Sequence, residues 1–372
     1  MPIYMDRHDL PGVTAKDVAK AHQEDLKIQD QYGCRAITYW FDEERQTAFC
    51  LIEAPDKGAV KAMHEHAHGL IPHQIIEVNN QVVESFLGRI EDRHVEDQKE
   101  PFIENESAFR SILATNIKYS KGKHQCLNKQ EFILSQRRHH AIVSKMIERY
   151  KGRIAEYNEQ CTLCSFVSAS QAFTCAIEIR NSFVGNNRQN DKPVSVQLGI
   201  CAGSPIAQSG DFFGNTIQQA RNMCYMSERN QITMSSGVAD HCRKNNISSF
   251  EKENVVILKR SEESFIEQLF HTMEKSCKKE GFKLDKLATE LGVSKSQLYR
   301  KIVALMHLSP NDFIKEYRLS KALKMMEKQE CSISEIAYET GFSSPSYFSK
   351  CFKERFGILP SLFINACESG EE

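Results

Sequence analysis

The segment Ser332–Gly357, SISEIAYETGFSSPSYFSKCFKERFG, decides the fold of the C-terminal part of the chain. Two short runs with helical periodicity flank Gly341, and glycine permits the backbone conformation that a tight turn requires. The apolar side chains fall on one side of each run, so the two helices can share a seam. This pattern predicts a helix-turn-helix unit. The seam residues are Ile333, Ile336, Ala337, Phe342, Phe348 and Phe352.

The same plan occurs earlier in the chain, in Leu284–Leu305, LDKLATELGVSKSQLYRKIVAL. Gly292 provides the turn, and Ser294 is placed to cap the second helix. Between the two units, SPNDFIKEYRLSKALKMMEKQ (309–329) reads as one long helix that begins at Ser309 and Pro310. We therefore expect an all-helical domain in which one helix connects two helix-turn-helix units. The first seam comprises Leu284, Leu287, Ala288, Val293, Leu298 and Ile302.

This C-terminal segment resembles the AraC/XylS family of transcription regulators. The likeness is carried by GFSSPSYFSKCFKERFGILPSLF (341–363) and by RLSKALKMM (318–326). The resemblance implies that the second helix of each unit enters a major groove of double-stranded DNA. An unrelated helical bundle is the alternative interpretation. Carried over by position, the base-facing residues are Ser296, Tyr299 and Arg300 in the first unit and Pro345, Ser346 and Lys350 in the second.

Among these residues, Arg300 can reach guanine in bidentate fashion, and Lys350 can contact guanine or a phosphate. Pro345 and Ser346 are short, so we expect the second unit to read few bases directly. Lys295 and Lys353 are expected to contact phosphate, which positions the protein without specifying sequence. For each residue the alternative is a polar side chain that only faces solvent.

The charge distribution agrees with a C-terminal partner that is a polyanion. Residues 1–100 carry 11 basic and 19 acidic side chains, a net charge of −8, whereas residues 275–360 carry 16 basic and 10 acidic ones, a net of +6. A basic segment attracts nucleic acid, although a solvated charged surface would have the same composition.

The N-terminal segment alternates strand and helix patterns. Strands are predicted in PIYMDRH, RAITYWFD, TAFCLIEA and QIIEVN, and helices in TAKDVAKAHQEDLKIQDQYG and DKGAVKAMHEHAHG. Thr14 is the expected cap of the first helix. The order βαββαβ predicts a ferredoxin-like sandwich with both helices on one side of the sheet.

Histidines concentrate in this segment. His64 and His68 lie four residues apart on one helix face, His22 lies on the other helix, and His8 ends the first strand. The fold can bring these four together, and imidazoles suit nickel, zinc or copper better than calcium or magnesium. We therefore predict a metal site at His8, His22, His64 and His68, with His66 and His73 outside it. A surface helix with uncoordinated histidines is the alternative.

Residues 1–80 also resemble a family of small ferredoxin-like proteins described as nickel-binding. The likeness lies in MDRHDLPGVT (5–14), AHQEDLKIQDQYG (21–33), YWFDEE (39–44), CLIEAPDK (50–57) and HEHAHGLIPHQIIEV (64–78). The resemblance implies that nickel is a candidate for the divalent transition metal.

The middle segment, about residues 107–245, resembles class III adenylate/guanylate cyclases. The likeness is carried by GRIAEYNEQCTLCSFVSASQAFTCAIEIR (152–180) and by VQLGICAGSPIAQSGDFFGNTIQQARNMCYMSERNQITMSSGVAD (196–240). Such enzymes hold metal ions with two carboxylates, but Asn116 and Gln160 occupy those positions. Gln218 and Asn222 replace the transition-state Asn and Arg, and on a helix the neighbouring Arg221 points about 100° away.

This segment is therefore predicted to be an α/β domain without cyclase activity, used for dimerisation or for nucleotide sensing. Cys161 and Cys164 in CTLC could be half a zinc site or a redox pair. No second CxxC follows, so a structural role is the favoured interpretation.

Composition limits the remaining possibilities. The chain has 372 residues, of which 41% are hydrophobic and 26% charged, as in ordinary globular proteins. No apolar run approaches the length of a membrane span, and the N-terminus lacks the pattern of a secretory signal, so we expect a cytoplasmic protein. The 13 scattered cysteines suggest reduced thiols.

Together these patterns predict a multidomain α+β plus all-α chain. The expected parts are 1–90 (ferredoxin-like, metal-binding type), 91–106 (linker), 107–245 (cyclase-like), 246–264 (linker), 265–364 (DNA-binding) and 365–372 (tail). The predicted function is a non-enzymatic, sequence-specific transcription regulator with metal and cyclase-like modules as input. Expected partners are DNA, a second copy of the chain and a metal or small-molecule effector, with RNA polymerase a further candidate. The alternatives are a metal store, or a residual nucleotide-processing enzyme, with an appended DNA-binding domain.

Overall fold

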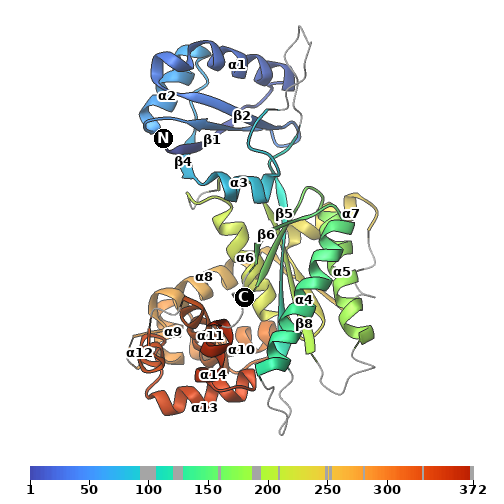
Figure 1. Cartoon of the computed structure of the whole chain (residues 1–372), viewed down its shortest axis with the longest axis vertical. Helices are drawn as coiled ribbons and strands as arrows, with labels where there is room; N and C mark the ends of the chain where they lie inside the picture. Colours follow the sequence, from blue (N-terminus) through green and yellow to red (C-terminus); the bar gives the residue numbers. More distant parts are fainter. Residues whose placement is uncertain are drawn as a thin grey trace.

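The computed structural model describes residues 1–92, 106–119, 129–157, 161–186, 194–207, 210–247, 250, 254–279, 281–328 and 331–368. The chain forms three modules: the first lies at one end of the longest axis, and the third lies beside the lower half of the second at the other end (Figure 1). The first is a four-stranded sheet with helices, the second is built on a six-stranded sheet, and the third is helical. The predicted fold class, an α+β module of ferredoxin-like order and an α/β module followed by an all-helical one, is confirmed.

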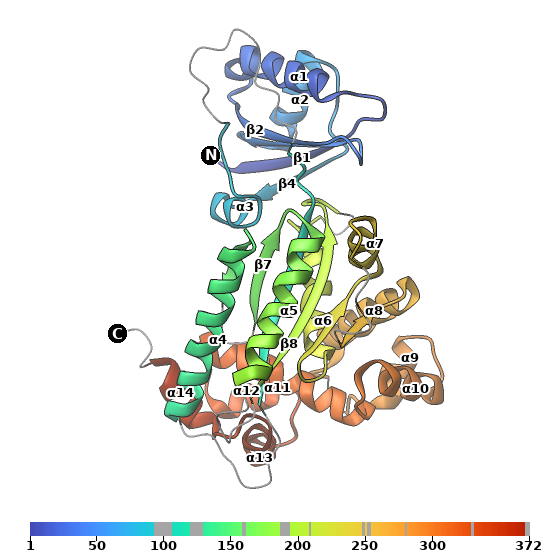
Figure 2. The same cartoon turned by 90° about the vertical axis from the view of Figure 1, so that its right-hand side faces the viewer.

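The N-terminal module has the expected βαββαβ order. Its elements are β1 (Ile3–Asp9), α1 (Ala15–Ile28), η1 (Gln29–Tyr32), β2 (Arg35–Asp42), β3 (Thr47–Glu53), α2 (Lys57–Ala67) and β4 (Gln74–Val78), followed by α3 (Asn80–Leu87). The strands are antiparallel in the order β2-β3-β1-β4. Helices α1 and α2 cover one face of the sheet (Figure 2). Thr14 and Asp17 form a capping box that fixes the start of α1.

The middle module is a mixed sheet in the strand order β10-β9-β8-β5-β7-β6. Its strands are β5 (Arg110–Tyr119), β6 (Arg153–Tyr157), β7 (Thr162–Phe166), β8 (Val194–Gly203), β9 (Gln231–Met234) and β10 (Val255–Ile257). Helices α4 (Lys129–Arg149) and α5 (Ala169–Asn186) lie on one side, with α7 (Ser236–Lys244), and α6 (Gly214–Met226) lies on the other. Two buried cores result, one on each side of the sheet.

The C-terminal module comprises α8 (Arg260–Ser276) and the two helix-turn-helix units. The first unit is α9 (Leu284–Glu290) and α10 (Lys295–Met306), and the second is α12 (Ile333–Glu339) and α13 (Pro345–Phe356). They are joined by α11 (Pro310–Lys328) and followed by α14 (Pro360–Glu368). Gly292 and Gly341 have positive φ at the turns, and Ser294 caps α10 as expected. Helix α8 begins inside the segment that the sequence suggested as a linker.

The modules share buried surfaces. One core is continuous from Trp40, on the underside of the first sheet, through Phe86 of α3 and Met223 of α6 to Phe270 of α8. At the far end of the middle sheet, Ile117 of β5 is buried among the apolar side chains of the second helix-turn-helix unit. The helical C-terminal module is therefore packed against the middle module within the described part of the chain.

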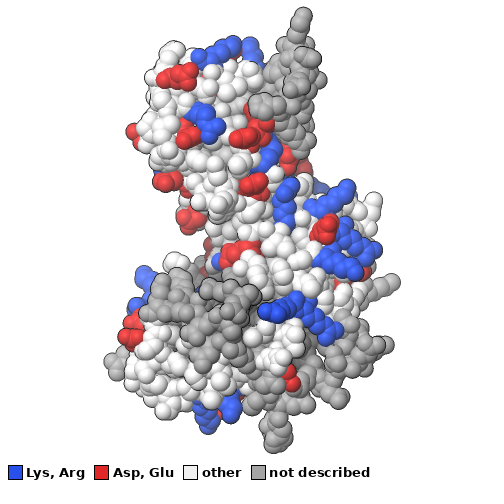
Figure 3. Space-filling view, in the orientation of Figure 1, with Lys and Arg blue, Asp and Glu red and all other residues white. Residues whose placement is uncertain are grey.

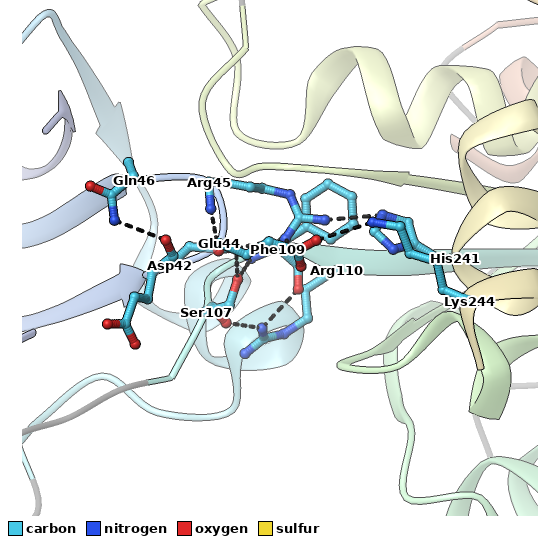
Figure 4. A network of polar contacts seen from close by, with 10 residues as sticks. Asp42, Glu44, Arg45, Gln46, Ser107, Phe109, Arg110, His241 and Lys244 are labelled. Atoms are coloured by element: carbon cyan, nitrogen blue, oxygen red, sulfur yellow. Dashed lines mark hydrogen bonds and ion pairs between the residues drawn. The ribbon is translucent and has the colours of Figure 1, made fainter. Parts of the chain in front are cut away.

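A polar network fixes the first module on the second (Figure 4). Arg45, in the turn between β2 and β3, pairs with Asp42 at 2.8 Å, contacts His241 Nε2 of α7 at 3.0 Å and stacks 3.7 Å from the centroid of Phe109. Beside it, Lys244 pairs with Glu44 at 3.2 Å. Burial lowers the pKa of His241, and the charge of Arg45 lowers it further. The neutral imidazole is therefore suited to accept a hydrogen bond from Arg45.

Gly199 of β8 permits α6 to lie directly on the sheet. A Cβ added there would stand 2.2 Å from the backbone nitrogen of Cys224 and 2.3 Å from the carbonyl oxygen of Ala220. Backbone atoms cannot yield as a flexible side chain does, so α6 would have to move. Since α6 also packs against α8, any side chain at Gly199 disturbs both contacts.

We predict that Gly199→Ala destabilises the chain by about 1–3 kcal/mol, the usual effect of overpacking a core. The matched control is Gly237→Ala on α7, where nothing lies within 4 Å of the added Cβ. The control should be neutral or stabilising by about 0.5–1 kcal/mol, since alanine favours helix. Urea unfolding measures both; equal stability of the two variants would contradict the close approach of α6.

Candidate metal centre and DNA-reading surface

The helix-covered face of the first sheet holds a buried group of polar side chains. Asp6 and His8 are two residues apart on β1 and so point to the same face. Cys50 of β3 pairs with Asp6 in the strand register, and His64 of α2 packs over them. One potential ligand atom from each of these four buried residues lies within 4.8 Å of the others.

A second group shares His64. Nε2 of His64 hydrogen-bonds with Asp6 Oδ2 at 2.8 Å, while Nδ1 lies 3.0 Å from Asp25 Oδ1 of α1 and 3.1 Å from His68 Nε2. Asp25, His64 and His68 form the second group whose ligand atoms lie within 4.8 Å. His64 therefore stands between two carboxylates, with one ring nitrogen toward each group.

The charges in this network support one another. Burial opposes ionisation of His64, but Asp6 and Asp25 raise its pKa to about 10. Burial would also raise the pKa of Asp6, yet the charges of His8 and His64 outweigh it and lower that pKa. The pKa of Asp25 is lowered against burial by hydrogen bonds from His64 and His68. Without a metal, His64 is thus an imidazolium held by two carboxylates.

His8 differs from its neighbours. It is 3% exposed, and neither ring nitrogen has a hydrogen-bond partner in the described residues. Its Nε2 lies 3.2 Å from Asp6 Oδ1, close enough for an ion pair but without hydrogen-bond geometry. A buried imidazole whose nitrogens make no hydrogen bond is the kind of group that a bound ion or a water satisfies.

A small cavity opens beside His8. It has a volume of about 20 Å³ and is lined by both polar and apolar side chains. That volume accommodates a single water or ion. The polar lining comprises His8, His22, Asp25, Tyr39, Cys50 and His68.

Of the four predicted ligands, the structure brings His8, His64 and His68 together. His22 lines the same cavity, but its Nε2 hydrogen-bonds with Asp92 Oδ2 at 3.0 Å. His66 contacts Tyr32 at 2.8 Å, and His73 Nδ1 accepts from the Asp9 backbone at 3.1 Å, so both lie apart from the ligand groups.

Sequence reasoning did not include Asp6, Asp25 or Cys50 among the candidate ligands. The spacing Asp6-x-His8 on one strand was a usable signal, because alternate strand residues share a face. Cys50 carried no comparable signal, since its position depends on the pairing register of β1 with β3.

The second helix of each helix-turn-helix unit presents its predicted base-facing residues to solvent. Arg300 and Lys350 each lie six residues after their N-caps, Ser294 and Ser344, and so occupy equivalent positions in the two units. Ser296, Tyr299 and Ser346 are also exposed, and Pro345 is half-buried at the first turn of α13. No sequence signal singled out Tyr347, which is 50% exposed beside Ser346.

The two predicted phosphate contacts are exposed as well. Lys353 lies on the outer face of α13, whereas Lys295 pairs with Asp285 of α9 at 2.8 Å. An exposed pair of this kind contributes little energy, so Lys295 can exchange Asp285 for phosphate. Basic side chains also gather over the middle module along α4 and α7, on the face that Figure 3 shows.

The described residues at the positions compared with cyclases in the sequence each make a polar contact within the chain. Asn116 accepts a hydrogen bond from the backbone of Ile117, and Gln218 donates to Asn222 at 2.8 Å. Arg221 pairs with Glu156 at 2.6 Å. Gln160 lies outside the described residues.

Comparisons with known proteins agree with the two terminal modules. Residues 287–366 match the model of a helix-turn-helix domain, and residues 4–78 match that of the nickel responsive protein SCO4226-like family. The chain thus carries an AraC-type helix-turn-helix domain at its C-terminus. At its N-terminus it carries a SCO4226-like domain.

Individual relatives cover only parts of the chain. Histidine kinase P4 of Formosa agariphila is 39% identical over 28% of this chain and 8% of its own length. The HTH-type transcriptional regulator GbdR of Pseudomonas aeruginosa is 40% identical over 21% of each protein. The chain therefore spans a small fraction of these curated relatives.

Two solved structures cover other parts. SCO4226 from Streptomyces coelicolor A3(2) is 34% identical over 20% of this chain and 94% of its own, with a TM-score of 0.20. An adenylate/guanylate cyclase/hydrolase from Silicibacter pomeroyi is 20% identical over 38% of this chain and 82% of its own, with a TM-score of 0.32. No helix in the described ranges has the length and apolarity needed to cross a membrane.

We predict that His64→Ala destabilises the metal-free protein by about 3–5 kcal/mol at pH 7, because two buried carboxylates lose their cation. The pKa of His64 is raised from 6.5 to about 10. Its stabilising contribution is therefore complete below pH 6.5 and is lost as the pH rises through about 10. Denaturant unfolding in chelator, from pH 6.5 to 10, should show the difference from wild type shrinking.

The control is His66→Ala, on the exposed face of the same helix, which should change stability by less than about 0.5 kcal/mol. A loss at His64 that is small and independent of pH would show that no buried charge network exists there.

Proposed function

We propose that the chain is a sequence-specific DNA-binding transcription regulator that takes a transition metal ion as its input. The observation that carries the DNA part is the pair of helix-turn-helix units with Arg300 and Lys350 exposed at equivalent positions. The AraC-type match and the relative named as a transcriptional regulator support it. Arg300 reads a guanine, and Lys295 and Lys353 contact phosphate.

The metal input is supported by how well the residues fit such an ion. His8 is buried and its ring nitrogens make no hydrogen bond within the described residues, the adjoining cavity has room for one ion, and the donors combine imidazole, thiol and carboxylate groups. This mixture suits nickel, zinc or copper better than calcium or magnesium. The SCO4226-like match favours nickel. Asp6, His8, Cys50 and His64 would hold the ion; Asp25, His64 and His68 are the competing set.

The ion's charge supplies the signal. An ion held by His64 would require the imidazole without its proton, and it would supply the positive charge that the imidazolium otherwise places between Asp6 and Asp25. His22 lines the same cavity and holds Asp92, in the segment that leaves the first module. Arg89 of that segment stacks on Trp40, whose side chain belongs to the core shared with α6 and α8. Contacts thus run without a break from the cavity toward the helical module.

For the middle module we propose a structural or sensory role rather than catalysis. The amide of Asn116 cannot replace a metal-holding carboxylate. Gln218 and Asn222 leave the site without its charge-stabilising arginine, and the neighbouring Arg221 is paired with Glu156. We also propose dimerisation and a nucleotide effector for this module, and contact with RNA polymerase for the whole chain. Cyclic nucleotide formed from ATP or GTP by the purified protein would overturn this role.

Replacement of Arg300 by Ala should weaken operator binding by about 1–3 kcal/mol and relax the preference at one base pair. Operators selected from a random DNA pool, followed by titration of single-base variants, provide the measurement. Arg229→Ala, an exposed arginine of the middle module, is the matched control and should bind as wild type does. An equal loss on every DNA sequence would make Arg300 a phosphate contact instead.

Nickel affinity should rise about tenfold per pH unit between pH 6.5 and 8.5, because binding releases the proton of His64. Isothermal titration with NiCl₂ in buffers of different ionisation enthalpy measures the affinity and the released proton. His8→Ala should abolish tight binding if the Asp6 group holds the ion, and His68→Ala if the Asp25 group does. An affinity unchanged by both substitutions would place the metal elsewhere.

A further inference from the structure

Cys161 and Cys164, the two cysteines of CTLC, lie on opposite sides of the middle sheet. Cys161 packs with Leu163 against the core that contains α6, whereas Cys164 is buried in the core that contains α5. The alternation of side chains along a strand separates them in this way. They cannot form a pair with each other while the strand is intact, so any partner of Cys161 must come from the α6 side.

Helix α6 supplies such a partner, Cys224. Because Gly199 has no side chain, α6 approaches β8 closely at this residue, and the Cys224 thiol lies 3.4 Å from the carbonyl oxygen of Gln197. Gln197 pairs with Asn116 in β5, and the neighbouring Thr115 pairs with Thr162 in β7. Both cysteines therefore stand over the same row of the sheet, and each thiol lies near enough to the other to affect its pKa.

The surroundings distinguish the two thiols. Cys161 is partly exposed and Cys224 is buried. A hydrogen bond from Cys224 and next the charge of Arg221 lower the pKa of Cys161, although burial opposes this. Burial raises the pKa of Cys224. A more acidic, more accessible thiol beside a buried one is the arrangement of an attacking and a resolving cysteine.

We propose that Cys161 and Cys224 form a peroxide-oxidisable thiol pair that closes into an intramolecular disulfide. The Cys161 thiolate attacks one oxygen of a hydroperoxide, ROOH, which breaks the O–O bond, releases ROH and leaves a sulfenic acid. The Cys224 sulfur then attacks the Cys161 sulfur, the S–O bond breaks, and the hydroxide leaves with the Cys224 proton as water. Overall, two thiols are oxidised and one hydroperoxide is reduced to ROH and water.

The pair lies close to the helical module. Arg221 is one turn before Cys224 on α6, and Lys324 of α11 is near enough to both Arg221 and Cys161 for their charges to affect its pKa, which burial lowers. A disulfide between the two cysteines would tie the start of β7 to α6 at this contact. The proposal does not depend on metal binding or on the identity of the operator.

Treatment of the purified full-length chain with hydrogen peroxide tests the pair, with intact mass and non-reducing peptide mapping as readouts. The expected product has lost two hydrogens and contains one peptide in which Cys161 is linked to Cys224. Cys161→Ser should abolish the crosslink. Cys224→Ser should leave a sulfenic acid on Cys161 that dimedone traps. Cys164→Ser, the matched control in the core on the other side of the sheet, should form the crosslink as wild type does.

Two results would overturn the proposal. One is a crosslink that maps to Cys161 and Cys164. The other is no Cys161–Cys224 crosslink at peroxide concentrations that oxidise other cysteines of the same chain. If a serine variant fails to fold, differential alkylation of the wild-type protein before and after peroxide tests the proposal instead. Disulfide formation must protect Cys161 and Cys224 from alkylation together.

Discussion

The contact of α6 with two partners is the constraint on which the rest of the structure depends. One side of this helix lies on the middle sheet, where Gly199 permits backbone to approach backbone. The other side contributes Met223 to the core that continues into α8 and the first helix-turn-helix unit. Tyr225 adds an aromatic contact with Phe270 at 5.5 Å between ring centroids. A displacement of α6 must therefore also change its packing against α8 of the C-terminal module.

The buried carboxylate–imidazole network plays a comparable part in the first module. Two carboxylates in a sheet-and-helix interior are unfavourable unless a cation compensates them. His64 provides that cation when it is protonated, and a metal ion would provide it otherwise. The metal-free protein and the metal-bound protein would thus differ in the charge that lies between Asp6 and Asp25. The difference is confined to a small region on helix α2. This helix lies over one face of the first sheet, and the other face of that sheet contributes residues to the core shared with the later modules.

Much of the fold followed from local patterns. Strand alternation, the Thr14 cap and the glycine turns at Gly292 and Gly341 predict most elements, because each depends on a few neighbouring residues. The pairing register and the packing between modules depend on residues far apart in sequence. For that reason Cys50 was missed, His22 was grouped with the ligands although it contacts Asp92, and nothing indicated that Ile117 enters the second unit's core.

The most direct test of a metal-responsive regulator is an operator titration with and without nickel. Coupling of about 1–3 kcal/mol would change operator affinity about 5- to 150-fold for the wild-type protein. In the double variant His64→Ala/His68→Ala, with unchanged circular dichroism, nickel should have no effect. If the wild-type protein binds nickel but holds its operator equally tightly in both conditions, the N-terminal module stores metal and does not report it to DNA.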